Sequence, residues 1–240
     1  MMRHLTCLFL LVLCACATHR ALPVRYDLDG IPDPMGSQPP LNATIAIPPI
    51  ASPSWLRTTA LLYRLGYEAP AYPRAYAQSE WIAPPGELLT QRLRESIAAA
   101  NRGVTLGQLD DTSKGYRLEV SLESFVQVFT SPDHSRCVVA FSATLLTGRD
   151  DVLAQRTFRT ARAALRPDAA GGVEGLVDAA DADFQQILTW LGETLATRTL
   201  GAASEKAPRS GRASPRDAHG CPLEGTCEQE PADRASYSRP

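Results

Sequence analysis

Hydrophobic and polar residues alternate most regularly between Tyr116 and Val128. Apolar side chains take every second position there, with charged or polar side chains between them, which is the period of a β-strand with one buried and one wet face. The polar side changes character near its end, where Phe125, Gln127 and Phe129 follow one another at alternate positions. That side is interpreted either as an interface for a partner or as the place where the closing helix rests.

Other segments carry strand patterns on both sides of the first predicted helix. The first of them is stopped by Pro48-Pro49, and the segment that starts at Cys137 is apolar on both faces, as a central strand is. A short alternation at Tyr26-Asp27-Leu28 is a candidate for an added edge strand. The predicted strands span 43–50, 56–65, 74–82, 137–146 and 152–161.

Two helices are predicted from a period of 3.6 residues. The first opens at Pro84-Pro85, where the fixed φ of proline suits a helix start, and it ends at Asn101. The second runs from Val173 to Leu195, and Gly171-Gly172 before it is interpreted as a hinge. The apolar face of the first helix holds Leu89, Leu93, Ile97 and Ala100, while Arg92, Arg94 and Glu95 are expected to face outward.

The order β–β–β–α–β–β–β–α predicts one α/β (α+β) domain, in which two helices pack on one face of a mostly antiparallel sheet. We assign this domain to residues 43–200, after a Pro-rich tether over 16–42 and before a polar tail over 201–240 that we expect to be disordered. In the tail, Cys221 and Cys227 are candidates for a small disulfide loop. Cys137, in an apolar strand, is interpreted as a buried small hydrophobe.

The first fifteen residues have the pattern of a secretory signal. A positive start at Arg3 is followed by an apolar run that is too short to span a bilayer as a permanent helix. Leu13-Cys14-Ala15-Cys16 then resembles the bacterial lipobox, which predicts a cut before Cys16 and lipid, palmitate included, on its thiol. Cys14 is the weaker candidate because it follows a large leucine. The alternative is an ordinary signal peptide that is cut after Ala15 or Ala17.

Composition and motifs narrow the chemistry. The chain has 240 residues, 44% of them hydrophobic and 21% charged, with a net charge of −2, so a globular protein is expected and nucleic acid is not an expected partner. Nucleophile, zinc-peptidase and phosphate-loop motifs are missing from the sequence. We therefore expect no catalytic residue, metal or cofactor, and any ATP hydrolysis would occur in another subunit.

Several short motifs in this order resemble the ABC-type transport auxiliary lipoproteins, including the paraquat-inducible lipoprotein type that works with MCE-domain transporters. The motifs are Leu61-Leu62-Tyr63-Arg64, Tyr76, Glu80-Trp81-Ile82-Ala83-Pro84-Pro85 and Leu88-Leu89. The resemblance implies a periplasmic lipoprotein that acts with an MCE protein, a permease and an ATPase to move lipids between the inner and outer membranes. Some relatives assemble as rings, so a homo-oligomeric ring is an expected partner arrangement. The polar tail after Leu200 and the loop 66–73 depart from the family pattern.

Four residues are candidates for function. Cys16 is the predicted lipid attachment site, and Ala17 after it, in place of the aspartate that retains lipoproteins in the inner membrane, indicates the periplasmic face of the outer membrane. Trp81 is a candidate partner contact, although we favour core packing over the helix start. Phe125 is a second candidate partner contact. Arg64 has three interpretations: an inward ion pair, a partner contact or a solvated strand end.

Two other function classes compete with a transport accessory protein. An outer-membrane lipoprotein adaptor or assembly factor for another envelope complex would have a similar anchor and domain. A periplasmic hydrolase would need a cluster of polar residues in a pocket, and the sequence shows none.

Overall fold

The computed structural model describes residues 22–28, 41–68, 72–106 and 115–205. In these ranges the chain forms a mixed eight-stranded sheet with two helices, and the predicted α/β class with a single domain is confirmed. The strands are β1 (Val24–Tyr26), β2 (Ile45–Ala46), β3 (Ala60–Leu65), β4 (Arg74–Trp81), β5 (Thr105–Leu106), β6 (Tyr116–Ser131), β7 (His134–Thr147) and β8 (Val152–Ala163).

The long strand β6 is the centre of the sheet. One of its edges pairs with β7 in an antiparallel ladder along almost its whole length, and β7 pairs with β8 in the same way. Its other edge is followed in parallel by β2, by an isolated bridge at Ala51 and by β3. Beyond β3 lie β4, antiparallel to it, and β1, parallel to β4. The longest ladders are therefore antiparallel, and the short strands add the parallel pairs.

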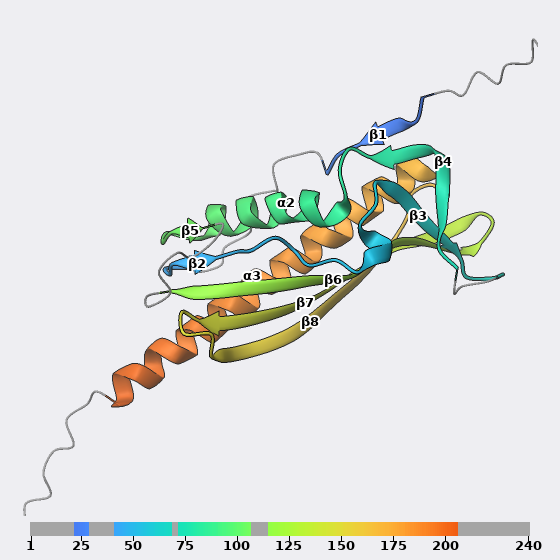
Figure 1. Cartoon of the computed structure of the whole chain (residues 1–240). Helices are drawn as coiled ribbons and strands as arrows, with labels where there is room; N and C mark the ends of the chain where they lie inside the picture. The colour runs from blue at the N-terminus through green and yellow to red at the C-terminus, as the bar shows by residue number, and fades with distance from the viewer. Residues whose placement is uncertain (1–21, 29–40, 69–71, 107–114, 206–240) are drawn as a thin grey trace, which may run out of the picture.

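Both helices cover one face of this sheet, as Figure 1 shows. Helix α2 (Pro85–Ala100) begins with proline in its first turn, as predicted. Helix α3 (Ala169–Glu205) crosses β6, β7 and β8 and continues past the edge of the sheet. Between helices and sheet the aromatic rings meet in pairs: the centroids of Phe141 and Phe184 are 5.2 Å apart, and those of Phe158 and Trp190 are 5.8 Å apart.

A β-bulge explains the broken alternation in β6. The pairing with β7 shifts register between Leu122 and Ser124, so one extra residue is inserted. Before the bulge the even-numbered side chains face the helices, and after it the odd-numbered ones do, because one residue of slip reverses the faces of a strand. Leu122 and Phe125 consequently belong to the same core cluster. The side that carries Phe125 and Gln127 lies beneath the closing helix.

Two predicted strands are shorter than expected. Within 43–50 only Ile45–Ala46 forms a ladder, because Pro48 and Pro49 have no N–H to donate, although the chain rejoins β6 at Ala51. In the segment 56–65, Leu56 is the last residue of a 3-10 turn, η1 (Ser54–Leu56), and the strand begins only at Ala60. The second helix, by contrast, starts earlier and ends later than predicted.

Part of the predicted tether belongs to the sheet. Val24–Tyr26 pairs with Ser79–Trp81 in β4, and Leu41 forms a bridge with Asn101 at the end of α2. The tether assigned to 16–42 therefore overlaps the domain, since three of its residues complete an edge strand. The alternation at Tyr26-Asp27-Leu28 marks the right region, and the strand begins two residues earlier and ends at Tyr26.

Candidate functional site

The predicted partner contacts Trp81 and Phe125 lie inside the core. Their side chains are 1% and 2% exposed, and their ring centroids are 5.4 Å apart. The rings pack the end of β4 against β6, which is the core role that we favoured for Trp81. A partner would reach either ring only after the domain rearranged. Cys16 lies outside the described residues, and so do Cys221 and Cys227.

Arg64 is half-buried near the end of β3. Its guanidinium carbon lies 5.5 Å from the ring centre of Trp55 in η1, which is a cation–π distance. The Nε atom is buried without a hydrogen-bond partner among the described residues. One of the three interpretations of Arg64 is an inward ion pair. Among the described residues, Arg64 contacts the Trp55 ring instead.

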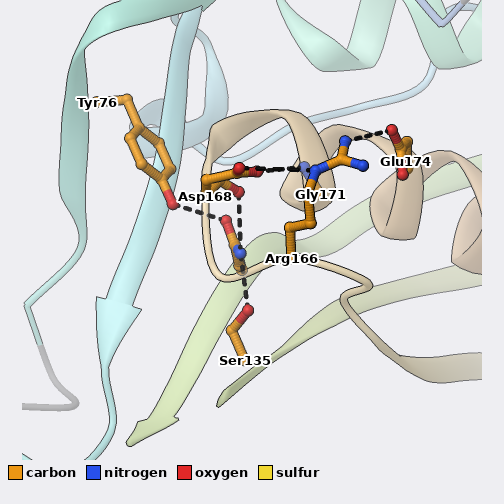
Figure 2. A network of polar contacts seen from close by, with 7 residues as sticks. Tyr76, Ser135, Arg166, Asp168, Gly171 and Glu174 are labelled. Carbon is orange, nitrogen blue, oxygen red and sulfur yellow. Dashed lines mark hydrogen bonds and ion pairs between the residues drawn. The ribbon is translucent and has the colours of Figure 1, made fainter. Parts of the chain in front are cut away.

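A polar network that the sequence did not predict lies beneath the start of α3. Gln127 is fully buried, and its amide oxygen accepts a hydrogen bond of 2.8 Å from the hydroxyl of Tyr76. Its amide nitrogen donates to the Ser135 hydroxyl at 2.8 Å and to the Asp168 carbonyl at 3.3 Å. Figure 2 shows Tyr76, Ser135 and Asp168 converging from different elements. Burial is the main cause that raises the pKa of Tyr76 above its ordinary value, so its phenol stays protonated and able to donate.

The first turn of α3 is fitted closely to this network. The Asp168 carboxylate accepts a hydrogen bond of 2.7 Å from the N–H of Gly171, which caps the helix start. Arg166 forms an ion pair of 2.6 Å with Glu174 across the same turn (Figure 2). A Cβ atom on Gly172 would overlap the side-chain oxygen of Gln127. Gly171 and Gly172 therefore lie inside the helix and permit close approach, which corrects their interpretation as a hinge.

Cys137, in β7, is a buried thiol beside the first turn of α3. Its side chain is 0% exposed, and its Sγ donates to the Gly172 carbonyl at 3.2 Å. Burial raises the pKa of the Cys137 thiol to about 12, so the sulfur is a neutral thiol at physiological pH. The interpretation of Cys137 as a buried small hydrophobe is confirmed.

Arg92 corrects the prediction that it faces solvent. It is 6% exposed, and its guanidinium forms two hydrogen bonds, of 2.6 and 2.7 Å, to the Asp181 carboxylate of α3. A third donor of the same group reaches the Leu28 carbonyl at 2.9 Å. The hydrogen bond to Asp181 is the first cause that raises the pKa of Arg92. One side chain thus joins α2, α3 and the segment that follows β1.

A buried carboxylate lies farther along α3. Asp183 is 0% exposed and accepts a hydrogen bond from the Thr160 hydroxyl of β8, while its second oxygen has no hydrogen-bond partner among the described residues. Removal from water is the largest effect on this group and raises the pKa of Asp183. The carboxyl is therefore held where its charged form is disfavoured.

The described ranges show few features of a ligand site. An open recess of about 470 Å³ lies beside β1 and β4, lined in part by Leu22, Pro23, Ala60 and Ala77. Within these ranges no group of three or more His, Cys, Asp or Glu side chains is placed to hold a metal ion. None of the described helices combines the length and the apolar character that a membrane crossing requires.

The same fold occurs in solved structures. Protein XCC0632 from Xanthomonas campestris superposes with a TM-score of 0.64 at 15% identity, over 74% of this chain and 99% of that one. The structure of an uncharacterized protein gives a TM-score of 0.55 at 14% identity, over 71% and 99% of the two chains. The PelC dodecamer from Paraburkholderia phytofirmans gives only 0.38 at 12% identity, over 61% and 85%, and supports no argument about assembly. No curated protein sequence matches the chain.

The first two of these structures define the class as a mixed α/β domain with two helices on one face of the sheet. The family follows from the sequence: residues 26–188 match the model of the ABC-type transport auxiliary lipoprotein component, and the chain belongs to that family. The match begins at the last residue of β1 and ends within α3, so it covers β2 to β8, helix α2 and the first half of α3. The resemblance stated from the short motifs is confirmed.

Proposed function

We propose that the chain is a non-catalytic accessory lipoprotein of an MCE-type ABC transporter that moves lipids between the inner and outer membranes. The observation that carries the proposal is the family match over 26–188, which spans nearly the whole described domain. In the proposed complex a permease and an ATPase supply the driving energy, and the MCE-domain protein carries lipid. Copies of this chain form a homo-oligomeric ring beside it.

The buried polar groups support a structural role rather than catalysis. Gln127 has partners in the sheet for both its amide oxygen and its amide nitrogen, and its hydrogen bond to the Asp168 carbonyl links the sheet to the start of α3. The Cys137 thiol is buried and protonated, so it is a poor nucleophile. Both groups that resemble active-site chemistry are thus used inside the fold.

Lipid on Cys16 attaches this domain to the membrane in our proposal. The described chain begins at Leu22, only six residues after Cys16. Strand β1 and the bond from Arg92 to Leu28 then fasten the entering segment to the domain. Because this connection is short, a lipid on the Cys16 thiol would hold the sheet close to the membrane.

The first experiment tests the transporter. The full-length chain with a C-terminal tag is purified from its native membranes in mild detergent, and co-purified proteins are identified by mass spectrometry. We expect an MCE-domain protein with its permease and ATPase. These proteins should no longer co-purify from membranes when Cys16→Ser prevents anchoring of the tagged chain. Recovery of an outer-membrane β-barrel or secretin without any MCE component would favour the adaptor function instead.

The second experiment tests the membrane. Ala17→Asp introduces the residue that retains lipoproteins in the inner membrane, and Ala17→Ser is the matched control. We expect the wild-type and serine chains in the outer-membrane fraction of a density gradient and the aspartate chain in the inner-membrane fraction. An unchanged distribution of all three chains would contradict the assignment to the outer membrane.

A further inference from the structure

One end of the domain gathers turns from three parts of the chain. The N–H of Gly66, after β3, bonds to the Phe129 carbonyl of β6, and Phe129 pairs with Ser135 at the start of β7. The carbonyl of Ser135 in turn accepts a hydrogen bond from the N–H of Ala164, after β8. We call this the hairpin end: residues 66–68, 72–73, 132–133 and 164–168. Figure 1 shows it as the end of the sheet opposite β2 and β5.

Three of the eight exposed large apolar side chains of the described residues lie together at the hairpin end. Tyr67 and Tyr72, which flank the β3–β4 turn, are 44% and 71% exposed, and Leu165, in the loop before α3, is 83% exposed. Large apolar side chains that remain open to water on neighbouring turns are typical of a surface that meets another apolar phase. Tyrosine suits the boundary between water and lipid, because its ring is apolar and its hydroxyl is polar.

The chain enters the domain at this same end. Strand β1 is parallel to β4, with Val24 opposite Ser79, and β4 starts at the hairpin end with Arg74. Pro23 and Leu22 therefore run along β4 in the direction of Arg74, and Leu22 lines the recess together with Ala77. Leu22 is itself 90% exposed.

The length of chain before Leu22 limits where the anchor can be. Leu22 is the sixth residue after Cys16, and a fully extended chain covers about 3.3–3.6 Å per residue, so the anchor lies within about 20 Å of Leu22. Strand β6, at 16 residues, is about 50 Å long by comparison. The connection therefore keeps Leu22, and the edge of the sheet formed by β1 and β4, close to the bilayer.

Most charged side chains at the hairpin end are paired. Arg74 pairs with Glu68 at 3.0 Å, and Arg166 pairs with Glu174 at 2.6 Å, whereas the exposed Asp133 of the β6–β7 turn has no ion pair among the described residues. Paired charges lose less on approach to a medium of low dielectric constant than single charges do. Tyr72 and Leu165 stand beside these pairs in the sequence.

From these observations we infer that the hairpin end rests on the membrane, with Tyr67, Tyr72 and Leu165 in the headgroup region. The occupant of this surface is the lipid bilayer that holds the anchor, and the inference rests on the proposed lipid attachment at Cys16. Contact at the hairpin end and attachment at Cys16 together give two points of support. The domain then stands upright, with β2 and β5 directed away from the bilayer.

Site-specific photo-crosslinking tests the surface. A photoreactive benzoylphenylalanine replaces Tyr72 or Leu165 in the full-length lipidated chain, reconstituted in vesicles of phosphatidylethanolamine and phosphatidylglycerol. Val104 is the matched control, because it is 53% exposed and lies beside β2 at the opposite end. We expect lipid adducts, measured by mass spectrometry, to be several-fold more abundant at positions 72 and 165 than at 104.

The outcomes separate the two proposals. Equal adducts at all three positions on a protein that floats with the vesicles overturn the surface and leave the anchor standing. Adducts to protein in place of lipid at positions 72 and 165 also overturn it, in favour of a protein partner. If the wild-type chain does not float with the vesicles and behaves like Cys16→Ser, the proposed lipid attachment at Cys16 is wrong. The proposed membrane contact of the hairpin end, which rests on that attachment, is then overturned as well.

Discussion

The fit between α3 and the sheet predicts that Gly172→Ala is destabilising, against the ordinary preference of helices. In a helix interior alanine is favoured over glycine by about 0.5–1 kcal/mol. At Gly172, however, the new methyl group would overlap the side-chain oxygen of Gln127. Gln127 is fully buried, so the overlap is relieved only if the amide leaves its partners or the first turn of α3 lifts from β6.

The magnitude follows from those two ways of relief. Overpacking of a core costs about 1–3 kcal/mol, and each hydrogen bond that Gln127 loses costs about 1 kcal/mol. After the helix preference is subtracted, we expect the free energy of unfolding to fall by about 1–3 kcal/mol. Gly192→Ala in the same helix is the matched control, because its Cβ would meet only Leu41 at 3.8 Å. That variant should be neutral or stabilised by up to about 1 kcal/mol.

Urea unfolding of the full-length chain in detergent, followed by tryptophan fluorescence, measures both variants. A second pair isolates the cause: Gln127→Ala removes the overlapped oxygen, so Gly172→Ala should cost less in that background than in the wild type. If Gly172→Ala is as stable as Gly192→Ala, α3 is not held as closely to β6 as described. The reasoning about the network would then be refuted.

The remaining predictions concern three buried groups. Asp183→Asn should remove a pH dependence of the free energy of unfolding. Because the pKa of Asp183 in the folded state is raised above the unfolded value of about 3.9, the free energy of unfolding of the wild type falls as pH rises through the folded-state pKa. If the free energy of unfolding of the variant has the same slope against pH, this prediction is wrong. Arg92→Met should lower the free energy of unfolding by about 2–3 kcal/mol, because Asp181 and a backbone carbonyl lose their donors. The double variant with Asp181→Leu should recover part of this loss in urea unfolding, and no recovery would argue against the ion pair. Cys137, with a pKa raised to about 12, should resist iodoacetamide at pH 8 until the protein unfolds, and peptide mass spectrometry that finds fast alkylation of the folded chain would disprove its burial.

Local patterns predicted the elements whose formation depends on nearby residues. The alternation from Tyr116 identified β6, and Pro84-Pro85 marked the start of α2 within one residue. The sequence also held a signal for the polar network, because Gln127 stood among aromatic residues on a side that had been polar. That signal became interpretable only with the bulge between Leu122 and Ser124, whose position depends on pairing with β7.

Features set by distant partners were beyond the reach of the sequence pattern. Arg92 occupies a helix position that periodicity assigns to solvent, and it is buried because Asp181, 89 residues later, neutralises it. Gly171-Gly172 is interpreted as a hinge because it precedes the predicted helix, whereas the lack of a side chain at Gly172 makes room for Gln127. The parallel pairing of β1 with β4 likewise depends on residues more than fifty positions apart.

Helix α3 is longer than the sheet that it covers. Its 37 residues extend about 55 Å at 1.5 Å per residue, from the hairpin end to beyond the far edge of the sheet. Its buried residues end at Leu191, and the end of the helix extends past the sheet (Figure 1). A partner bound to this overhang would lie at a fixed height above the hairpin end. Deleting one heptad from the overhang would lower that height by about 10 Å while turning the tip by only about 20°.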